Sequence, residues 1–246
     1  MDVLPKEFNA KAKIHACIGG AASMCPDGRM IFTDANTNGV FFLSPSGEVE
    51  EIVPSSGSTK IYYADFSISP VQPELILAIQ QIHGEHGEVV DTIAVINTKT
   101  KTSRVVVEGA DFYSHPRFSP DGKNICWTQW NHPDMPWTGS QLYVADWADG
   151  EVTKKTHVAG KSLESAVCQP RWSPDGILWF VDEPDGIWQL HRYDLASKTV
   201  EYVHIKGYEN FEMGKAEWSP GKSVSCSLSL EESEANSRKL HIWVFG

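Results

Sequence analysis

The sequence predicts an all-β protein, a five-bladed β-propeller with four-stranded antiparallel blades, and three observations lead to this fold class. First, a phrase built around Ser-Pro-Asp-Gly recurs with prolines at Pro26, Pro70, Pro120, Pro174 and Pro220, so that successive copies lie 44, 50, 54 and 46 residues apart. Self-similarity at such a period is typical of propellers, in which each repeat forms one blade. Second, a β-rich run follows each copy. Third, no helical hydrophobic period extends beyond a few residues.

The repeated phrase has the composition of a tight turn. Proline fixes φ, while Asp-Gly provides a side-chain acceptor and a residue that tolerates positive φ. The residue two positions before the proline is apolar in all five copies, which are Met24, Ile68, Phe118, Trp172 and Trp218. We therefore expect this position to pack between neighbouring blades, with the inner strand of each blade directly before the turn.

The other strands of each blade follow in order after the turn. Second strands are expected at residues 29–33, 74–79, 124–128, 177–181 and 223–227. Third strands are expected at 40–43, 92–96, 141–145, 188–193 and 240–244. Fourth strands are expected at 49–53, 103–107, 152–156 and 199–203.

The fifth repeat reaches Gly246 before a fourth strand appears. Residues 5–13 precede the first blade, and we expect them to supply this outer strand and close the ring. Closure would remove the open sheet edges that favour aggregation. The alternative is an irregular N-terminus beside an incomplete last blade.

Length and composition fit one domain. The 246 residues, 41% of them hydrophobic, divide into blades at about 14–57, 58–108, 109–160, 161–209 and 210–246 plus 5–13. No apolar run is long enough to span a membrane and no secretory signal is recognisable, so we expect a cytoplasmic protein. The net charge of −11 argues against nucleic-acid and membrane partners. The five cysteines form no Cys-x-x-Cys pair, which favours buried reduced thiols.

Residues 111–147 read DFYSHPRFSPDGKNICWTQWNHPDMPWTGSQLYVADW, and residues 168–176 read CQPRWSPDG. Both segments resemble the propeller domain of the prolyl oligopeptidase family, in the branch of acylaminoacyl-peptidase-like and dipeptidyl-aminopeptidase-like enzymes. The repeat is also similar to that of TolB-like propellers. The resemblance is strongest over about residues 105 to 230 and implies a propeller fold.

In that family the propeller accompanies an α/β-hydrolase domain that carries a catalytic Ser, Asp and His. This sequence contains no Gly-x-Ser-x-Gly elbow and no βαβ pattern to hold one. The resemblance therefore brings no catalytic residue of the family to this chain. We expect a stand-alone propeller that is not itself a peptidase.

Aligning the repeats on their prolines identifies candidate site residues. Five positions before each proline stand Ala21, Asp65, His115, Gln169 and Lys215. Seven positions before each proline stand Gly19, Tyr63, Tyr113, Val167 and Met213. Because strand residues alternate between faces, both columns are expected to line one side of the central channel. An acid, an imidazole and an ammonium group could then act as a catalytic acid–base set, namely Asp65, His115 and Lys215. The ligand-binding side chains would include Tyr63, Tyr113, Gln169 and Met213. A purely structural polar ring is the alternative.

A second candidate is the loop at residues 129–137, which is long, aromatic and stiffened by proline. We expect Trp130 and His132 to contact a ligand at one mouth of the channel. Trp137 is more simply explained as a packed residue.

Three functions remain open. The first is a metal-free and cofactor-free enzyme that performs isomerisation, cyclisation, elimination or hydrolysis on a small apolar or aromatic metabolite in the channel. The second is a non-catalytic module that binds a small molecule or peptide. The third is a scaffold that docks through one face onto a protein partner such as a separate hydrolase subunit.

Overall fold

The computed structural model describes residues 4–16, 19–54, 60–207, 211–217, 225–226 and 243–244. It contains four four-stranded antiparallel sheets, each formed by consecutive strands of the chain. The first two sheets comprise β1 (Ala22–Met24), β2 (Met30–Thr33), β3 (Val40–Leu43), β4 (Val49–Val53), β5 (Lys60–Ile68), β6 (Leu75–His83), β7 (Val89–Asn97) and β8 (Thr102–Val107). The next two comprise β9 (Phe112–Phe118), β10 (Asn124–Trp130), β11 (Gln141–Ala148), β12 (Glu151–Ala159), β13 (Val167–Trp172), β14 (Leu178–Asp182), β15 (Gln189–Asp194) and β16 (Thr199–Tyr202).

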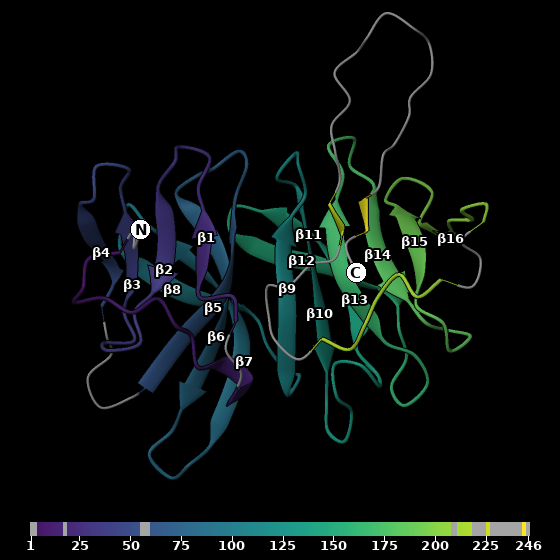
Figure 1. The fold of residues 1–246 in the computed structure, drawn as a ribbon, viewed down its shortest axis with the longest axis horizontal. Helices are drawn as coiled ribbons and strands as arrows, with labels where there is room; N and C mark the ends of the chain where they lie inside the picture. The colour runs from purple at the N-terminus through teal and green to yellow at the C-terminus, as the bar shows by residue number, and fades with distance from the viewer. Residues whose placement is uncertain are drawn as a thin grey trace, which may run out of the picture.

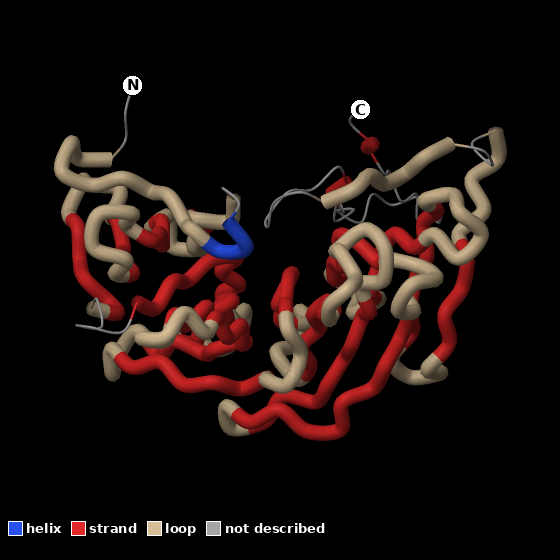
Figure 2. Tube along the Cα trace, turned by 90° about the horizontal axis from the view of Figure 1, so that it is seen from below, coloured by secondary structure: helices blue, strands red, loops and turns tan. Residues whose placement is uncertain are grey.

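The prediction of an all-β protein with four-stranded antiparallel blades is confirmed. Figure 1 shows the four sheets side by side in chain order, and Figure 2 shows them arranged around an arc. The described parts of the fifth repeat form a two-stranded pairing of β17 (Ser225–Cys226) with β18 (Trp243–Val244). The number of five blades and the closure of the ring stay predictions.

Apolar cores lie between successive sheets, and the middle strands, such as β3 and β6, are buried on both faces. The core between the first two sheets contains Ile31 and Phe42 from the first sheet and Ile76 from the second. Trp127, which is fully buried, lies in the next core, and Phe180 lies in the core between the third and fourth sheets. The near-continuous hydrophobic runs in the second and third strands follow from this two-sided burial.

The recurring Ser-Pro-Asp-Gly phrase forms the turn that joins the inner strand to the second strand. In the third sheet, the Ser119 hydroxyl donates to the Asp121 carboxylate, and Gly122 N–H donates to the Ser119 carbonyl oxygen at 2.9 Å. Gly122 has φ of 67°, as the sequence pattern requires. The turn therefore fixes where each inner strand ends.

Residues 4–16 form a strap that packs on the first three sheets, including the 3-10 helix η1 (Ile14–Ala16). The Phe8 ring contacts Phe32 and Phe41 edge-on, and Lys11 N–H donates to the Thr33 carbonyl oxygen. Ala12 and Ile14 are buried against the second sheet. The segment predicted to complete the fifth blade thus has its described contacts elsewhere in the fold.

Cys25, Cys126 and Cys168 are buried free thiols, as predicted for these three. Cys17 and the side chain of Cys226 lie outside the described part of the chain. Within the residues that the structure places, no helix has the length and apolarity needed to cross a bilayer.

Candidate functional site

Each inner strand of the second, third and fourth sheets contains a bulge at the same place. Asp65, His115 and Gln169 each stand five residues before a turn proline. Their φ values are 58°, 54° and 55°, respectively, in the left-handed region. The pairing registers shift here, between Ala64 and Ser67 in the second sheet and between Cys168 and Arg171 in the fourth. Left-handed φ at a residue with a side chain is uncommon and concentrates at functional sites. Three positions of the predicted polar column therefore share the same unusual backbone conformation.

The bulged residues of neighbouring sheets are linked directly. Asp65 N–H donates to the Gly20 carbonyl oxygen at 2.8 Å, and His115 N–H donates to the Asp65 carboxylate at 2.8 Å. The second carboxylate oxygen of Asp65 accepts from the Arg117 guanidinium at 2.6 Å. The Asp65 side chain is 3% exposed, so this pair is shielded from water. Asp65 thus ties the second sheet to the third.

The pKa of Asp65 reflects these contacts. Burial alone would raise it, but the charge of Arg117 and the hydrogen bonds from Arg117 and the His115 backbone hold the pKa below the ordinary value of 3.8. Asp65 is therefore an anion at neutral pH. A carboxylate held in this way is better suited to fixing its neighbours than to exchanging protons.

The hydrogen bonds of His115 define its tautomer. Nδ1 lies 3.4 Å from the Thr128 hydroxyl oxygen, and that hydroxyl donates to the Ser114 carbonyl oxygen. Since the Thr128 proton is already committed, Thr128 can only accept from His115, so the imidazole proton is assigned to Nδ1. Nε2 is then left with a lone pair, and Glu217 Oε2 lies 3.4 Å from it.

His115 and Glu217 lie at ion-pair distance, yet their pKa values indicate that both are neutral near pH 7. Burial lowers the pKa of His115 to about 4, with Asp65 opposing and Arg117 and Arg171 adding to the effect. Burial raises the pKa of Glu217 to about 8, and the Asp65 charge adds to this, while the two arginines oppose it. We therefore describe the pair as a protonated carboxyl group and a neutral imidazole, which between them hold one titratable proton near neutral pH.

Two polar atoms of this group are buried without a hydrogen-bond partner among the described residues, namely His115 Nε2 and Glu217 Oε1. The His115 side chain is 3% exposed and that of Glu217 is 10% exposed. Buried polar atoms in native proteins are nearly always paired, and an exception calls for an explanation such as a ligand or water. We call Asp65, His115, Arg117 and Glu217 the channel cluster.

The other predicted residues are dispersed. Lys215 is exposed, while Met213 is buried against the fourth sheet. Gln169 is buried at the bulge of the fourth sheet, in the position that corresponds to His115. The structure therefore brings Asp65 and His115 together, but not Lys215 with them.

Tyr63 and Tyr113 lie in the cores between sheets. The Tyr63 hydroxyl contacts the Ser103 hydroxyl and accepts from the Gln80 amide, both at 2.8 Å. The Tyr113 hydroxyl accepts from the Ala110 N–H, and burial raises its pKa. Both phenols are thus engaged by the protein, and their predicted role in ligand binding stays a prediction.

Trp130 is the last residue of β10 and His132 follows it in the loop that leads to β11, so their predicted contact with a ligand stays a prediction. The Trp130 ring stacks on Phe112 at 5.4 Å, while His132 is exposed and contacts the Asp111 carboxylate at 3.2 Å. The His15 ring of the strap lies edge-on to the Trp130 ring, with ring centres 5.4 Å apart. Neither residue belongs to the channel cluster.

Sequence reasoning missed Arg117, Arg171 and Glu217. All three stand three residues before a turn proline, where the first two repeats have serine. Three charged residues at the same position of the repeat could have identified this part of the site. The expectation of an unbroken strand, in which side chains alternate between faces, instead favoured the residues seven positions before each proline.

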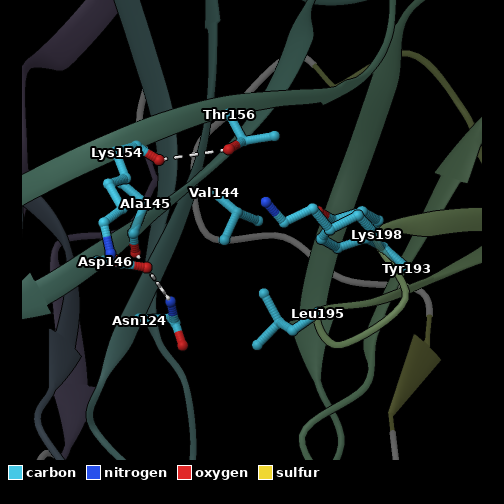
Figure 3. Close-up of a pocket in the computed structure, with 9 residues that line it drawn as sticks. All are labelled: Asn124, Val144, Ala145, Asp146, Lys154, Thr156, Tyr193, Leu195 and Lys198. Atoms are coloured by element: carbon cyan, nitrogen blue, oxygen red, sulfur yellow. Dashed lines mark hydrogen bonds and ion pairs between the residues drawn. The ribbon is translucent and has the colours of Figure 1, made fainter.

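A cavity of about 240 Å³ lies elsewhere, between the outer parts of the third and fourth sheets (Figure 3). On one side of it Lys154 pairs with Asp146 at 2.9 Å, and the Asn124 amide donates to the same carboxylate. Lys154 and Lys198 are largely exposed. None of the predicted site residues lines this cavity. Within the described residues no group of His, Cys, Asp and Glu side chains has the arrangement of a metal site.

The comparisons with known proteins agree with the fold. No family model matches the chain. It is 27% identical over 128 residues to dipeptidyl-peptidase 5 of Porphyromonas gingivalis, which covers 48% of this chain and 18% of that protein. It is 30% identical over 137 residues to a Bacillus subtilis protein named uncharacterized peptidase YuxL, which covers 55% of this chain and 20% of that protein. The matched regions are about a fifth of the length of these relatives.

Solved structures give the same result over most of the chain. A puromycin-hydrolyzing peptidase of Mycobacterium tuberculosis matches 93% of this chain with a TM-score of 0.78 and 22% identity, using 36% of its own length. An oligogalacturonate lyase in complex with manganese matches with a TM-score of 0.58 and 13% identity. TolB of Agrobacterium tumefaciens matches with a TM-score of 0.54 and 20% identity.

These matches define the class as a β-propeller. The homologues are peptidases of the prolyl oligopeptidase family, matched over their propeller portion, and the resemblance predicted from the sequence is confirmed. The fold is also related to that of oligogalacturonate lyase and of TolB-like propellers.

Proposed function

We propose that this chain is the substrate-recognition propeller of a peptidase-like system and that the channel cluster binds the N–H-bearing end of a peptide or peptide-like small molecule. The observation that carries the proposal is the pair of buried, unpaired atoms, His115 Nε2 and Glu217 Oε1. Leaving each of them unpaired costs about 1–3 kcal/mol, so a ligand that pairs both gains that stabilisation.

The chemistry of the two atoms favours a donor. With its proton on Nδ1, His115 presents an acceptor at Nε2, and the carbonyl oxygen of a protonated Glu217 is also an acceptor. An amide or amine N–H satisfies either of them. Lys215, which is exposed and stands two residues before Glu217 in the chain, supplies a positive charge for a carboxylate at the other end of the ligand. A short peptide combines these features.

The relatives support peptide-like ligands. Two of them are named as a dipeptidyl-peptidase and a puromycin-hydrolyzing peptidase. Hydrolysis would require a hydrolase domain or subunit, for which this sequence supplies no nucleophile elbow. The protein partner expected on one face of the propeller would be that hydrolase, and the propeller would select what reaches it.

Binding of puromycin and a panel of dipeptides, measured by isothermal titration calorimetry, tests the proposal. Glu217→Met removes both carboxyl oxygens, and His115→Phe removes both ring nitrogens. Each is expected to weaken binding about tenfold or more, as for the loss of one hydrogen bond in a buried site. Glu201→Met is the matched control, because Glu201 is exposed and pairs with Arg192. Equal affinity in all variants, or no binding by the wild-type protein, would overturn the proposal.

A second candidate is acid–base catalysis by the same pair, the metal-free and cofactor-free enzyme reading of the sequence. The pKa of about 8 for Glu217 favours it, because a carboxyl group that titrates near neutrality can exchange protons efficiently. Asp65 would hold His115 and Arg117 in place. The reaction would be isomerisation, cyclisation, elimination or hydrolysis of a small metabolite. Mass spectrometry of metabolite extracts incubated with wild-type protein and with His115→Ala distinguishes catalysis from binding, since only catalysis changes a substrate's mass or retention.

A further inference from the structure

The strap ends in a contact that joins three parts of the fold. His15, in η1, reaches from the strap to Asp91 at the start of β7, where Nε2 lies 2.5 Å from Oδ2. The same imidazole lies edge-on to Phe112 and to Trp130, each with ring centres 5.4 Å apart. Figure 2 shows η1 in blue at the inner side of the arc. His15 is 13% exposed in this position.

Three side chains surround the His15 ring, and we call Asp91, Phe112 and Trp130 the box. One wall is the stacked pair Phe112 and Trp130, whose planes are inclined by 18°. The floor is the Asp91 carboxylate, which is 1% exposed and accepts from the Gln81 amide through Oδ1 at 2.8 Å. Its other oxygen faces His15. Asp91, Phe112 and Trp130 all belong to the second and third sheets, so the box is built without a residue of the strap.

A buried carboxylate beside two aromatic faces is the arrangement that recognises nitrogen heterocycles and organic amines, through one N–H donor and ring contacts. His15 supplies both. It does so from a left-handed backbone conformation, with φ of 54° and ψ of 29°, which a residue with a side chain adopts at an energetic cost. The box therefore holds the strap in a conformation that the strap would not favour by itself.

We propose that the Asp91–Phe112–Trp130 box is a binding site for a nitrogen heterocycle or amine and that His15 fills it in the resting protein. A ligand carrying such a group competes with His15 and releases the end of the strap. Phe112 stands three residues before His115 on β9. The box thus shares β9 with two members of the channel cluster, His115 and Arg117, although the box does not depend on the function proposed for that cluster.

The test uses imidazole as the probe and His15→Ala to empty the box. Imidazole at about ten times its Kd is expected to raise the Tm of His15→Ala by about 3–6 °C while leaving the wild-type Tm unchanged. The measurement is made at about pH 9, where free imidazole and 1-methylimidazole are both neutral. Neutral 1-methylimidazole has no N–H for Asp91, so it is expected to give no rise.

A variant and a second measurement complete the test. His15→Ala combined with Asp91→Asn is expected to lose the response to imidazole, whereas His15→Ala combined with His132→Ala, which changes an exposed histidine, retains it. If His15→Ala does not fold, limited proteolysis of the wild-type protein replaces the Tm measurement. Imidazole is then expected to accelerate tryptic cleavage after Lys13, in the strap, more than 1-methylimidazole does. Equal effects of the two compounds in the folded variant, or in the proteolysis measurement, would overturn the proposal.

Discussion

The buried pair of His115 and Glu217 leads to a specific prediction about stability against pH. In the folded protein the pair holds one proton, because the pKa of Glu217 is about 8 and that of His115 is about 4. In the unfolded chain, with ordinary values of 4.5 and 6.5, the pair also holds one proton between those two pH values, on the histidine. Equal proton numbers in both states mean that the pair contributes no pH dependence in that window.

Replacing either residue is expected to reveal a pH dependence of the unfolding free energy that the two groups cancel in the wild-type protein. The Glu217 contribution is present below its unfolded pKa of 4.5 and is lost as the pH rises through about 8. Between about pH 5 and pH 7 the loss is about 2–3 kcal/mol. Glu217→Gln, which does not titrate, is therefore expected to gain about that much stability relative to the wild-type protein over this interval.

The His115 contribution has the opposite direction. It is present above the unfolded pKa of 6.5 and is lost as the pH falls through about 4. Between about pH 6.5 and pH 4.5 the loss is about 2 kcal/mol. His115→Gln is therefore expected to gain about that amount relative to the wild-type protein as the pH is lowered.

Urea denaturation followed by tryptophan fluorescence gives these free energies at each pH. The quantity to plot is the difference between variant and wild-type stability, which removes contributions from all other groups. Glu201→Gln, at an exposed ion pair, is expected to give a flat difference. Flat differences for Glu217→Gln and His115→Gln as well would show that both groups titrate as they do in water, and the argument for a shared proton would be wrong.

Two further predictions concern packing. Gly160→Ala is expected to destabilise the fold by about 2–5 kcal/mol, because a Cβ would lie 2.1 Å from the Ser140 carbonyl oxygen and φ is +80°. Gly47→Ala, at φ of +90° but with open space around it, should cost only about 1 kcal/mol in the same denaturation experiment, and equal costs would contradict this reasoning. Phe8→Ala is expected to cost about 1–3 kcal/mol through the loss of two edge-on ring contacts on the first sheet. Met24→Ala, at a side chain that is 63% exposed, is the control with little expected loss, and a loss for Phe8→Ala no larger than this would show that the strap does not stabilise the fold.

Much of the fold was predictable because it depends on a repeated turn. Proline and glycine at fixed positions fix where each inner strand ends, and the β-rich runs that follow are long enough to identify. The four described sheets contain the strands expected from those runs. The contacts of residues 4–16 were not predictable, since the hydrogen bond from Lys11 to Thr33 depends on tertiary packing that no local pattern records.

The channel cluster was only half predictable, and the bulge is the physical reason. In an unbroken strand, Tyr113 and His115 would share a face, as the alternation argument assumed. The bulge adds a residue on the inner strand, so the side-chain order changes there, and Tyr113 enters the core while His115 turns toward Glu217. Bulges are usually anticipated from glycine, but here the left-handed position holds Asp65, His115 and Gln169. A polar residue with positive φ stands at the same place in three sheets, so the bulge is a shared backbone feature, while the side chain that it carries differs from sheet to sheet and could be read only as a column of unlike polar residues.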